Sequence, residues 1–303
     1  MDKLLALNMF VETVRCGGYS AAARKLGVAT SSVTRQVAAL EAELGAALLN
    51  RSTRHSSPTE AGQAYFENAL AILDALEAAD NAIADRDGTA RGRMRISVPV
   101  EFGRRVIAPR LGRLLDRHPE LEVSLNLSDT MTDLFKDRVD LAVRLGTTVF
   151  NDELICKPIG HFERWIVASP EYLQRTAHPE YPQDLLEHAC LRFDYGNAHK
   201  NWLFRHGDEA ITVDVRGRLQ SNNADILRER ALAGEGVAML ADWLVAEDVR
   251  QGRLTRILPA YDVNPGTADS SINVLYLPNH RGSTRVKAFV DFLDETWRSI
   301  TWR

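Results

Sequence analysis

Cysteine is scarce in this sequence, and long hydrophobic runs are absent from it. The 303 residues include three cysteines, Cys16, Cys156 and Cys190, which lie far apart and are odd in number, so a disulfide framework is not expected. No stretch of about 18 apolar residues occurs, so no transmembrane helix is expected. The N-terminal residues carry Asp2 and Glu12 and lack a small-residue cleavage site, which favours an amphipathic helix over a signal peptide. These absences predict a protein of the reducing cytoplasm.

Motifs for catalysis and metal binding are also missing. The eight histidines are scattered and none has metal-ligand spacing to a cysteine, so no metal site is expected. The chain has no GxSxG, no P-loop and no GxGxxG after a strand, which argues against an enzyme and against a bound cofactor. Cys156 and Cys190 leave a redox switch open, although free cysteines that pack as small hydrophobic side chains are commoner.

Charge is unevenly distributed along a chain of otherwise ordinary composition. Apolar residues make up 45% and charged residues 26%, as in globular proteins, and the length allows two or three domains. The net charge of −4 alone argues against a nucleic-acid partner. Residues 1–58, however, hold seven basic and four acidic side chains, whereas residues 59–87 hold one basic and seven acidic ones. A basic head followed by an acidic segment is expected of a modular DNA-binding protein.

The chain divides into three parts at its helix-breaking residues. Residues 1–58 are predicted to form an all-helical head, and residues 59–87 a long alanine-rich helix. Glycines at both ends of 88–92 mark a hinge. Residues 93–303 alternate short apolar runs with helical patterns, which indicates an α/β domain built from βαβ units.

The head has the pattern of a helix-turn-helix. Apolar residues at helical spacing predict a first helix over 3–15, which ends at two glycines. Ser20 is expected to cap a second helix over 21–26, and Gly27 to turn the chain into the third. Two short helices joined by a turn that contains glycine are typical of a DNA-binding helix-turn-helix.

The third helix has one apolar and one polar face. Thr30 or Ser31 is expected to cap it. Its apolar face is predicted to consist of Val33, Val37, Leu40 and Leu44. The polar side chains are short hydrogen-bonding groups and one guanidinium, a set suited to base edges and phosphates: Thr30, Ser31, Ser32, Thr34, Arg35 and Gln36. Taken alone, these residues fit a solvated polar face equally well.

The segment that follows the third helix favours the DNA interpretation. Residues 47–62 begin with a short apolar run and become polar and basic. Arg51, Arg54 and His55 are placed to lie along phosphates, and contacts of this kind fix the register of a protein on DNA.

Residues 10–62 as a whole resemble the winged helix-turn-helix of LysR-type transcriptional regulators. The resemblance is carried by Phe10 and by SAAA at 20–23, LGV at 26–28, SVTRQV at 32–37, LLNR at 48–51 and TEAG at 59–62. Thr34 stands where the family usually has serine, and Leu49-Asn50 where it usually has Phe-Glu. The resemblance implies that Ser20 and the polar face of the third helix bind DNA in the major groove. It also implies that Arg51, Arg54 and His55 hold the backbone or the minor groove.

The resemblance also implies oligomers. Family members dimerise through a long linker helix, and here a rough heptad track, interrupted by Asp80, consists of Phe66, Ala69, Leu73, Leu76 and Ile83. A helix buried inside one domain is the alternative. Two dimers would form a tetramer, whose partners would be double-stranded operator DNA and the transcription machinery.

The C-terminal part resembles the family's effector-binding domain, which is similar in fold to periplasmic binding proteins. Lobe I is expected at 93–161 and 267–303 and lobe II at 162–266, with a small-molecule effector between the lobes. The expected strands are 94–98, 122–128, 139–146 and 272–277. Helices are expected from 99 to about 117, after a cap at 129–132, from an opening at 221–225 and over 283–299.

The effector site is expected where strands end and helices begin, because free N–H groups are available there. Three segments match both this rule and the family's pocket: 99–102, 128–132 and 222–225. The candidate residues are Pro99, Val100, Glu101, Phe102, Ser128, Thr130, Arg144, Tyr195 (or Phe193), Asn222 and Asn223. Helix N-termini that converge on one cleft favour a small anion, so we expect a carboxylate. For each residue a plain helix cap or surface loop is the alternative.

Glu101 does not fit a purely anionic ligand. Its carboxylate would repel an anion, unless it pairs with Arg104 or Arg105 or selects an amine or hydroxyl of the ligand.

Two functions from different classes remain. The first is an effector-responsive transcriptional regulator. The second is an α/β enzyme or a solute-binding protein in which the helical head serves only to form oligomers; it predicts turnover or tight ligand binding without affinity for DNA. The missing signal peptide disfavours a transport protein, and the missing nucleophile–base motif disfavours an enzyme.

Overall fold

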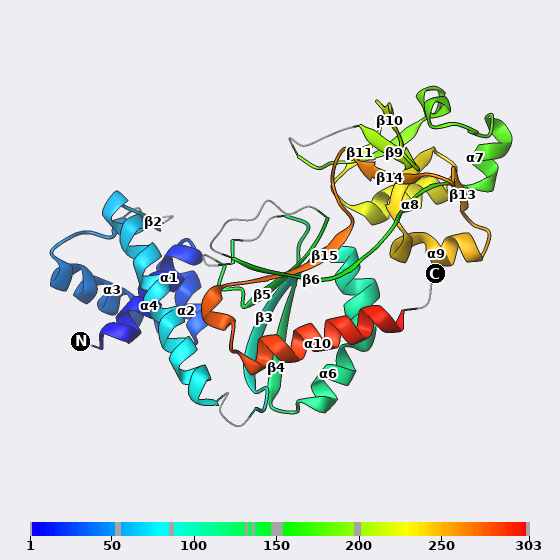
Figure 1. Ribbon diagram of the computed structural model, residues 1–303. Coiled ribbons are helices and arrows are strands. Elements are labelled where there is room, and N and C mark those ends of the chain that lie inside the picture. Colours follow the sequence, from blue (N-terminus) through cyan, green and yellow to red (C-terminus); the bar gives the residue numbers. More distant parts are fainter. Residues whose placement is uncertain are drawn as a thin grey trace. The chain divides into compact units, whose positions relative to one another are not determined.

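The computed structural model describes residues 2–51, 56–84, 88–130, 133–134, 137–146, 154–196 and 201–300, without the side chains of 51, 56, 74, 77–78 and 80–84. The chain divides into two compact units, one of residues 1–87 with 133–138 and one of residues 88–132 with 139–303. Figure 1 shows that the first unit is mainly helical, whereas the second contains twisted sheets flanked by helices. Among the described residues, no helix has the length and apolar character that crossing a bilayer requires.

The first unit is a helix-turn-helix followed by a two-stranded wing and a long helix. Its elements are α1 (Lys3–Arg15), α2 (Tyr19–Leu26), α3 (Thr30–Leu44), β1 (Leu49–Arg51), β2 (Ser56–Pro58) and α4 (Glu60–Ala84). The predicted first helix is confirmed at both ends. The strands β1 and β2 are antiparallel, with Asn50 opposite Ser57.

The predicted side-chain caps of α2 and α3 are wrong. Gly18 is the N-cap of α2, so Ser20 lies within its first turn. Ala29 is the N-cap of α3 and makes no side-chain cap bond, so neither Thr30 nor Ser31 caps this helix. Helix stability in proteins comes mainly from packing of the apolar face. Buried Ala22 and Val33 therefore fix these helices without a capping side chain.

The core of the first unit joins α1, α3 and α4. Phe10, Val33, Val37 and Leu40 are fully buried, as the apolar pattern predicts. Leu44 is 36% exposed, so the predicted apolar face ends at Leu40. The face is short because Gly45, in the left-handed conformation at φ 65°, ends the helix directly after Leu44.

Helix α4 belongs to this core over its first three turns. Phe66 and Ala69 are buried, and the Phe66 ring meets the Phe10 ring edge-on at 6.5 Å. These two residues of the predicted heptad track therefore pack inside their own unit. Leu76 is 42% exposed, and the side chains of Asp80 and Ile83 lie outside the described residues.

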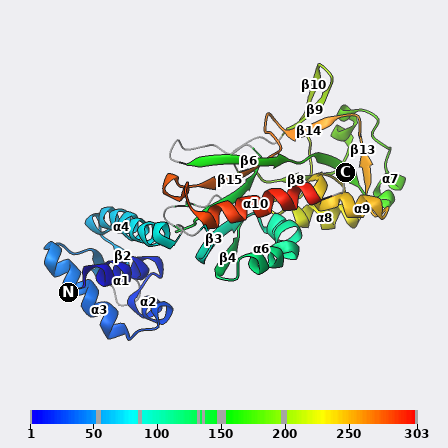
Figure 2. The same ribbon diagram turned by 60° about the horizontal axis from the view of Figure 1, so that its bottom comes forward.

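Lobe I of the second unit is a five-stranded mixed sheet with the order β4-β3-β5-β15-β6. Its strands are β3 (Gly92–Val98), β4 (Leu121–Leu127), β5 (Leu141–Leu145), β6 (Ile155–His161) and β15 (Ser271–Tyr276). Helices α6 (Leu111–Arg117) and α10 (Thr284–Ser299) lie beside the sheet (Figures 1 and 2). The four strands and the final helix predicted here are confirmed to within two residues.

Two details of lobe I differ from the prediction. The helix expected from 99 to 117 consists of α5 (Val100–Phe102), a π-turn (Gly103–Ile107), a 3₁₀ turn (Ala108–Arg110) and α6. Pro109 lacks an N–H, which interrupts the regular hydrogen bonding. The helix expected after 129–132 is wrong, because no described residue between 129 and 140 is helical. Asp129 instead accepts a hydrogen bond from the backbone N–H of Val100 at 3.0 Å.

Lobe II contains a five-stranded sheet with the order β11-β8-β12-β7-β13 and a three-stranded sheet with the order β10-β9-β14. The strands are β7 (Arg164–Ala168), β8 (Cys190–Phe193), β9 (Trp202–His206), β10 (Glu209–Val213), β11 (Gln220–Ser221), β12 (Val237–Ala241), β13 (Thr255–Ile257) and β14 (Asp262–Pro265). The helices are α7 (Pro170–Arg175), α8 (Ala224–Leu232) and α9 (Asp242–Arg250). The helix predicted to open at 221–225 is confirmed, because α8 begins at Ala224 with Asn223 as its N-cap.

Candidate DNA-binding surface and effector cavity

The polar side chains of α3 lie on the accessible side of a helix whose other side is buried. Thr30, Ser31, Thr34 and Arg35 are exposed, and Ser32 and Gln36 are half-buried. The Thr34 hydroxyl donates to the Thr30 carbonyl oxygen at 3.0 Å, so it presents its oxygen outward as an acceptor. The face therefore offers acceptors, donors and one positive charge from a single helix.

The turn before α3 fixes the angle at which this face is presented. Gly27 has φ 68°, in the left-handed region that glycine adopts without strain, and its N–H bonds to the carbonyls of Ala23 and Arg24. Ser20 is exposed on α2, the helix that precedes this turn.

The wing is anchored to α3 by the carboxylate of Glu41, a role that the sequence does not predict. Glu41 accepts hydrogen bonds from the backbone N–H groups of Leu48 and Leu49 at 2.8 and 3.1 Å. Gly62 packs so close to the wing that a Cβ there would lie 1.8 Å from the Leu48 carbonyl oxygen. Neither role follows a recognisable spacing, because each depends on backbone groups from another element.

The predicted backbone contacts of the wing are only partly described. Arg51 ends β1, but its side chain lies outside the described residues, as do Arg54 and His55. Asn50 donates to the Ser57 hydroxyl at 3.3 Å and to the Pro58 carbonyl at 3.2 Å, which joins the two strands of the wing.

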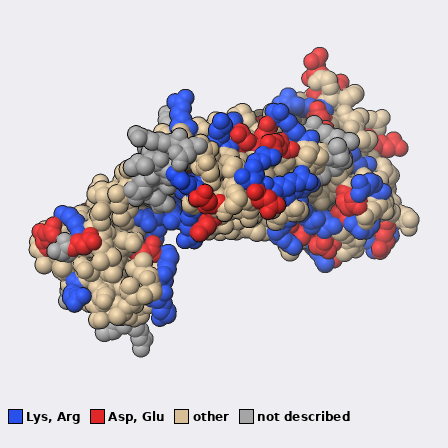
Figure 3. Space-filling view, turned by 90° about the horizontal axis from the view of Figure 1, so that it is seen from below, with Lys and Arg blue, Asp and Glu red and all other residues tan. Residues whose placement is uncertain are grey.

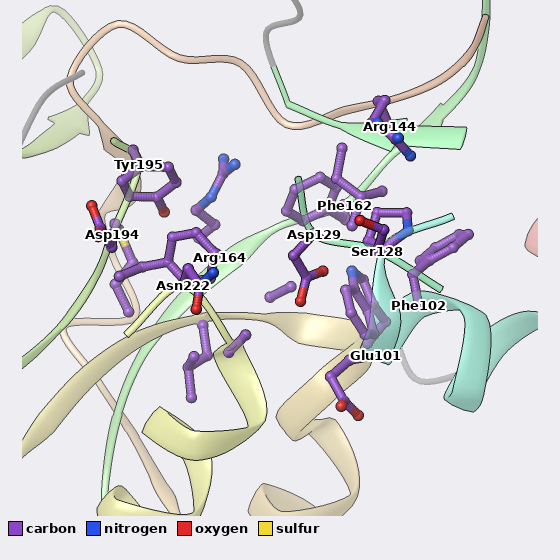
Figure 4. Close-up of a pocket in the computed structure, with 18 of the residues that line it drawn as sticks. Glu101, Phe102, Ser128, Asp129, Arg144, Phe162, Arg164, Asp194, Tyr195 and Asn222 are labelled. Carbon is purple, nitrogen blue, oxygen red and sulfur yellow. The ribbon is translucent and has the colours of Figure 1, made fainter. Parts of the chain in front are cut away.

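A cavity of about 560 Å³ opens between the two lobes of the second unit. Of the candidate effector residues, seven line it: Pro99, Glu101, Phe102, Ser128, Arg144, Tyr195 and Asn222. Figure 4 shows that the labelled lining residues come from both lobes. This volume fits an organic molecule of modest size.

Three candidate residues, Val100, Thr130 and Asn223, do not line this cavity, and their polar groups form hydrogen bonds to neighbouring groups of the protein. The N–H of Val100 is bound by Asp129. The Asn223 side chain accepts from the N–H groups of Asp225 and Ile226 at 3.0 and 3.1 Å, which caps α8. Thr130 bonds to Ser128. Some of the backbone N–H groups at the starts of α5 and α8 therefore already have acceptors within the protein. Fewer of these N–H groups are available to bind an anion than the sequence predicts.

Several lining residues were not among the predicted ones. They are Leu145, Phe162, Arg164, Asp194, Gly196, Met239, Leu240, Ala241 and Trp243, whereas Asp129 and Ala224 lie in the predicted segments 128–132 and 222–225 and Phe193 was named as an alternative. Five of them come from the strands β5, β7 and β12, and only the packing of the two lobes shows that these strands border a cavity. Figure 4 shows the carboxylate of Asp129 pointing into the space between the labelled side chains.

The two arginines of the cavity are held in fixed positions. Arg144 donates to the Ser97 hydroxyl at 3.0 Å and to the Val143 carbonyl at 2.7 Å. Burial lowers the pKa of Arg144, and the charge of Asp129 opposes that effect. Arg164 lies 4.7 Å over the Phe162 ring. Burial lowers the pKa of Arg164 too, opposed mainly by Tyr195. Both guanidiniums are partly desolvated cations, which a nearby anion would stabilise.

The negative charge of Glu101 is balanced by Arg104 and Arg105 of its own helical segment, which is one of the alternatives that the sequence left open. Its side chain is buried and accepts from Arg104 at 3.1 Å and from Arg105 at 3.4 Å. In Figure 4 its carboxylate points away from the other labelled side chains. Glu101 therefore contributes little repulsion to the cavity itself.

Charge outside the cavity is mixed. Figure 3 shows basic and acidic side chains interleaved over the α/β unit rather than separated by sign. Among the described residues, no group of three His, Cys, Asp or Glu side chains could hold a metal ion. The cysteines are free thiols, and burial raises the pKa of Cys190 to about 12.

Comparison with protein families gives two matches that together span most of the chain. Residues 4–63 match the family described as "Bacterial regulatory helix-turn-helix protein, lysR family". Residues 87–298 match the family described as "LysR substrate binding domain". These segments correspond to the first and the second unit of the structure.

Named relatives and solved structures agree with these matches. The transcriptional activator TtdR of Escherichia coli (strain K12) is 34% identical over 292 residues, covering 95% of this chain and 91% of the relative. A transcriptional repressor of Pseudomonas aeruginosa is 31% identical and covers 97% of this chain and 92% of the relative. The virulence activator AphB of Vibrio cholerae is 28% identical, with a TM-score of 0.64 over 96% of this chain and 98% of that one. CrgA of Neisseria meningitidis is 29% identical, with a TM-score of 0.61 over 96% and 97%.

Proposed function

The chain belongs to the LysR family of bacterial transcriptional regulators, and from this premise we propose which of its residues bind DNA and the effector. Like its relatives it is a DNA-binding regulator with a C-terminal domain for a small-molecule effector. Transcriptional regulators of this kind are not enzymes. We propose that it acts in the cytoplasm, where its DNA partner is found.

We propose that α3 is the recognition helix. The observation that carries this assignment is the contrast between its faces, with Val33 and Leu40 fully buried and Thr34 and Arg35 exposed. Thr30, Ser31, Ser32, Thr34, Arg35 and Gln36 then reach base edges in the major groove, with Ser20 alongside. Arg51, Arg54 and His55 of the wing hold the phosphate backbone or the minor groove.

Fluorescence anisotropy with DNA from upstream of the protein's own gene tests this assignment, with a scrambled fragment as reference. An arginine that reads a base contributes about 1–3 kcal/mol, so Arg35→Ala combined with Ser32→Ala is expected to lower operator affinity about 10- to 100-fold. Arg298→Ala, which removes an exposed charge from the other unit, is the matched control. Operator affinity within twofold of the unchanged protein for the double variant would show that α3 does not read the DNA.

We propose that the effector is a small carboxylate with a hydroxyl or amine group, bound in the cavity between the lobes. The desolvated guanidiniums of Arg144 and Arg164 favour the acid. Asp129, whose carboxylate points into the cavity, favours a hydrogen-bond donor on the same molecule. Phe162, Phe193, Tyr195 and other apolar side chains supply the remaining wall.

Matched ligands test the effector class. Trp243 lines the cavity, so tryptophan fluorescence of the full chain reports binding there. We expect mandelate and lactate to bind more tightly than phenylacetate and propionate, which lack the hydroxyl, and Asp129→Asn to reduce that preference. If mandelamide binds as tightly as mandelate, the carboxylate assignment is wrong.

We also propose the roles of the remaining segments. Residues 1–58 bind DNA, 59–87 dimerise, 88–92 form a hinge and 93–303 bind the effector. Two dimers form a tetramer that contacts the transcription machinery. Ile72 and Leu76, 49% and 42% exposed on α4, are the apolar surface available for dimerisation.

A further inference from the structure

An ion pair joins the two lobes beside the cavity. Arg105, in the π-turn after β3 of lobe I, donates from Nη2 to Oδ1 of Asp225 at 2.7 Å. Asp225 lies in the first turn of α8 in lobe II, 120 residues further along the chain. The side chains are 35% and 21% exposed, so the pair is partly shielded from water. Shielding makes an ion pair stronger than one on the open surface.

Each end of this pair is tied to a buried carboxylate. On the lobe I side, Arg105 Nε also binds Glu101 at 3.4 Å. On the lobe II side, Asp225 also accepts a hydrogen bond from Arg228 at 3.3 Å. Arg228 in turn donates two hydrogen bonds to Asp248, from Nε at 2.5 Å and from Nη2 at 2.8 Å. Glu101 and Asp248 have side chains only 6% and 1% exposed, so the ends are anchored within each lobe. A rigidly anchored pair loses little side-chain entropy when it forms.

The ion pair lies next to residues that line the cavity. Glu101 lines it from lobe I, and Ala224, next to Asp225 in sequence, lines it from lobe II. The π-turn at Gly103–Ile107 adds a residue to the helical turn between Phe102 and Ala108. Such turns are frequent at functional sites, where they redirect a side chain. Here the segment carries Arg105, while its neighbour Arg104 directs its hydrogen bonds to Glu101 of the same lobe.

We propose that Arg105 and Asp225 form a clasp that holds the two lobes at the separation at which the cavity binds its effector. The clasp acts through lobe position, so both are positioning residues. Without it, the lobes sample wider separations, and the fraction of molecules with a complete cavity falls. Apparent affinity falls in proportion to that fraction. The part of this inference that concerns affinity rests on the effector cavity proposed above.

The distance between the lobes tests the clasp without any ligand. Spin labels are attached to unnatural amino acids at Arg113 and Gln251, exposed positions on lobe I and lobe II, so the native cysteines are not involved. The labelled full chain is mixed with an excess of unlabelled chain, so that distances within one chain dominate the pulsed EPR signal. We expect one narrow distance distribution for the unchanged protein and broader distributions for Arg105→Gln and for Asp225→Asn.

Three further variants test whether the ion pair itself controls the distance between the lobes. The double variant Arg105→Gln with Asp225→Asn is expected to match the single variants, because either change alone removes the pair. Arg105→Lys keeps the charge and is expected to restore much of the narrow distribution. Arg104→Gln, which also removes a charge from Glu101, is the matched control and is expected to have no effect. An unchanged distribution in folded Arg105→Gln would overturn the clasp, as would an equal effect of Arg104→Gln.

A binding experiment then connects the clasp with the effector. For the acid of the panel above that binds, Arg105→Gln is expected to lower affinity about 3- to 10-fold, by an amount that shrinks as salt is added. If no acid binds while the distance distributions change as expected, the effector class is wrong and the clasp stands. If acids bind and the distributions do not respond, the clasp is wrong and the effector cavity stands.

Discussion

Replacing Asp248 by asparagine is expected to destabilise the α/β unit by about 3–5 kcal/mol. Asp248 lies on α9 with its side chain 1% exposed. It binds Arg228 of α8 through both oxygens, and it accepts from Arg253 Nε at 2.9 Å. Asparagine keeps the shape of the side chain, but it removes the charge and turns an N–H₂ group toward one of the guanidiniums.

The magnitude follows from the exposure of the two arginines. Arg228 is 11% exposed and would lose the buried carboxylate that binds it through both oxygens, keeping Asp225 at 3.3 Å and the exposed Glu229, and breaking a buried pair in this way costs several kcal/mol. Arg253 is 49% exposed, so solvent screens its charge and its contribution to the loss of stability is small. The loss therefore comes chiefly from one buried pair.

The effect is expected to depend on pH. Burial alone would raise the pKa of Asp248, but hydrogen bonds from Arg228 and Arg253 outweigh it and hold the pKa below the ordinary value of 3.8. A carboxyl whose pKa is lowered by folding stabilises the protein above about pH 4, and that contribution is lost as the pH falls through the folded-state pKa. The difference in stability between the unchanged protein and Asp248→Asn should accordingly shrink below pH 4.

Urea unfolding followed by tryptophan fluorescence measures this difference. All five tryptophans lie between residues 165 and 302, so the signal reports the α/β unit in the full chain. The expected loss moves the urea midpoint down by about 1–2 M. Glu247→Gln, one residue away in an exposed pair with Arg250, is the control and should change the free energy of unfolding by less than about 0.5 kcal/mol. Equal midpoints for the two variants would refute the reasoning.

Three further predictions concern other parts of the chain. Gly62→Ala should unfold or displace the wing and abolish operator binding, because the new Cβ would lie 1.8 Å from the Leu48 carbonyl oxygen. Circular dichroism measures the loss of structure and anisotropy the loss of binding, and unchanged operator binding would contradict this prediction. Glu41→Ala should cost about 1–3 kcal/mol of stability in the first unit by leaving two backbone N–H groups without their acceptor, and thermal unfolding of this unit by circular dichroism measures it. Cys190, with its pKa raised to about 12 by burial, should react with iodoacetamide at pH 8 only after unfolding, whereas half-buried Cys16 reacts in the native protein; mass spectrometry of the alkylated peptides distinguishes them.

The head and the sheets were predictable because periodic apolar patterns define them. The spacing of Val33, Val37 and Leu40 requires a buried helix face, and the runs at β3 and β4 require strands. The caps at Ser20 and Thr30 were not predictable, because packing fixes those helix starts without a side-chain acceptor. Propensity is a weak influence wherever tertiary contacts are strong.

The cavity could be predicted only in part. Ser128 and Asn222 line it because they directly follow strands, and Arg144 lines it from the end of a strand, which is a rule that a sequence can reveal. Arg164 and Trp243 line it because two lobes meet there, and no spacing in the sequence encodes that meeting. The clasp between Arg105 and Asp225 spans 120 residues and was hidden for the same reason.

Helix α4 connects the core of the head with the proposed dimer contact. Phe66 packs against Phe10, whereas Ile72 and Leu76 are exposed about a quarter-turn around the same helix. A partner helix that covers Ile72 and Leu76 would therefore pack directly against α4, which is itself part of the head's core. Ile72→Ser with Leu76→Ser is expected to dissociate the oligomer in sedimentation experiments while the head stays folded, whereas Phe66→Ala should unfold the head. Loss of head structure in the serine variant would show that these two side chains stabilise the unit itself, and the dimer contact would then have to lie elsewhere.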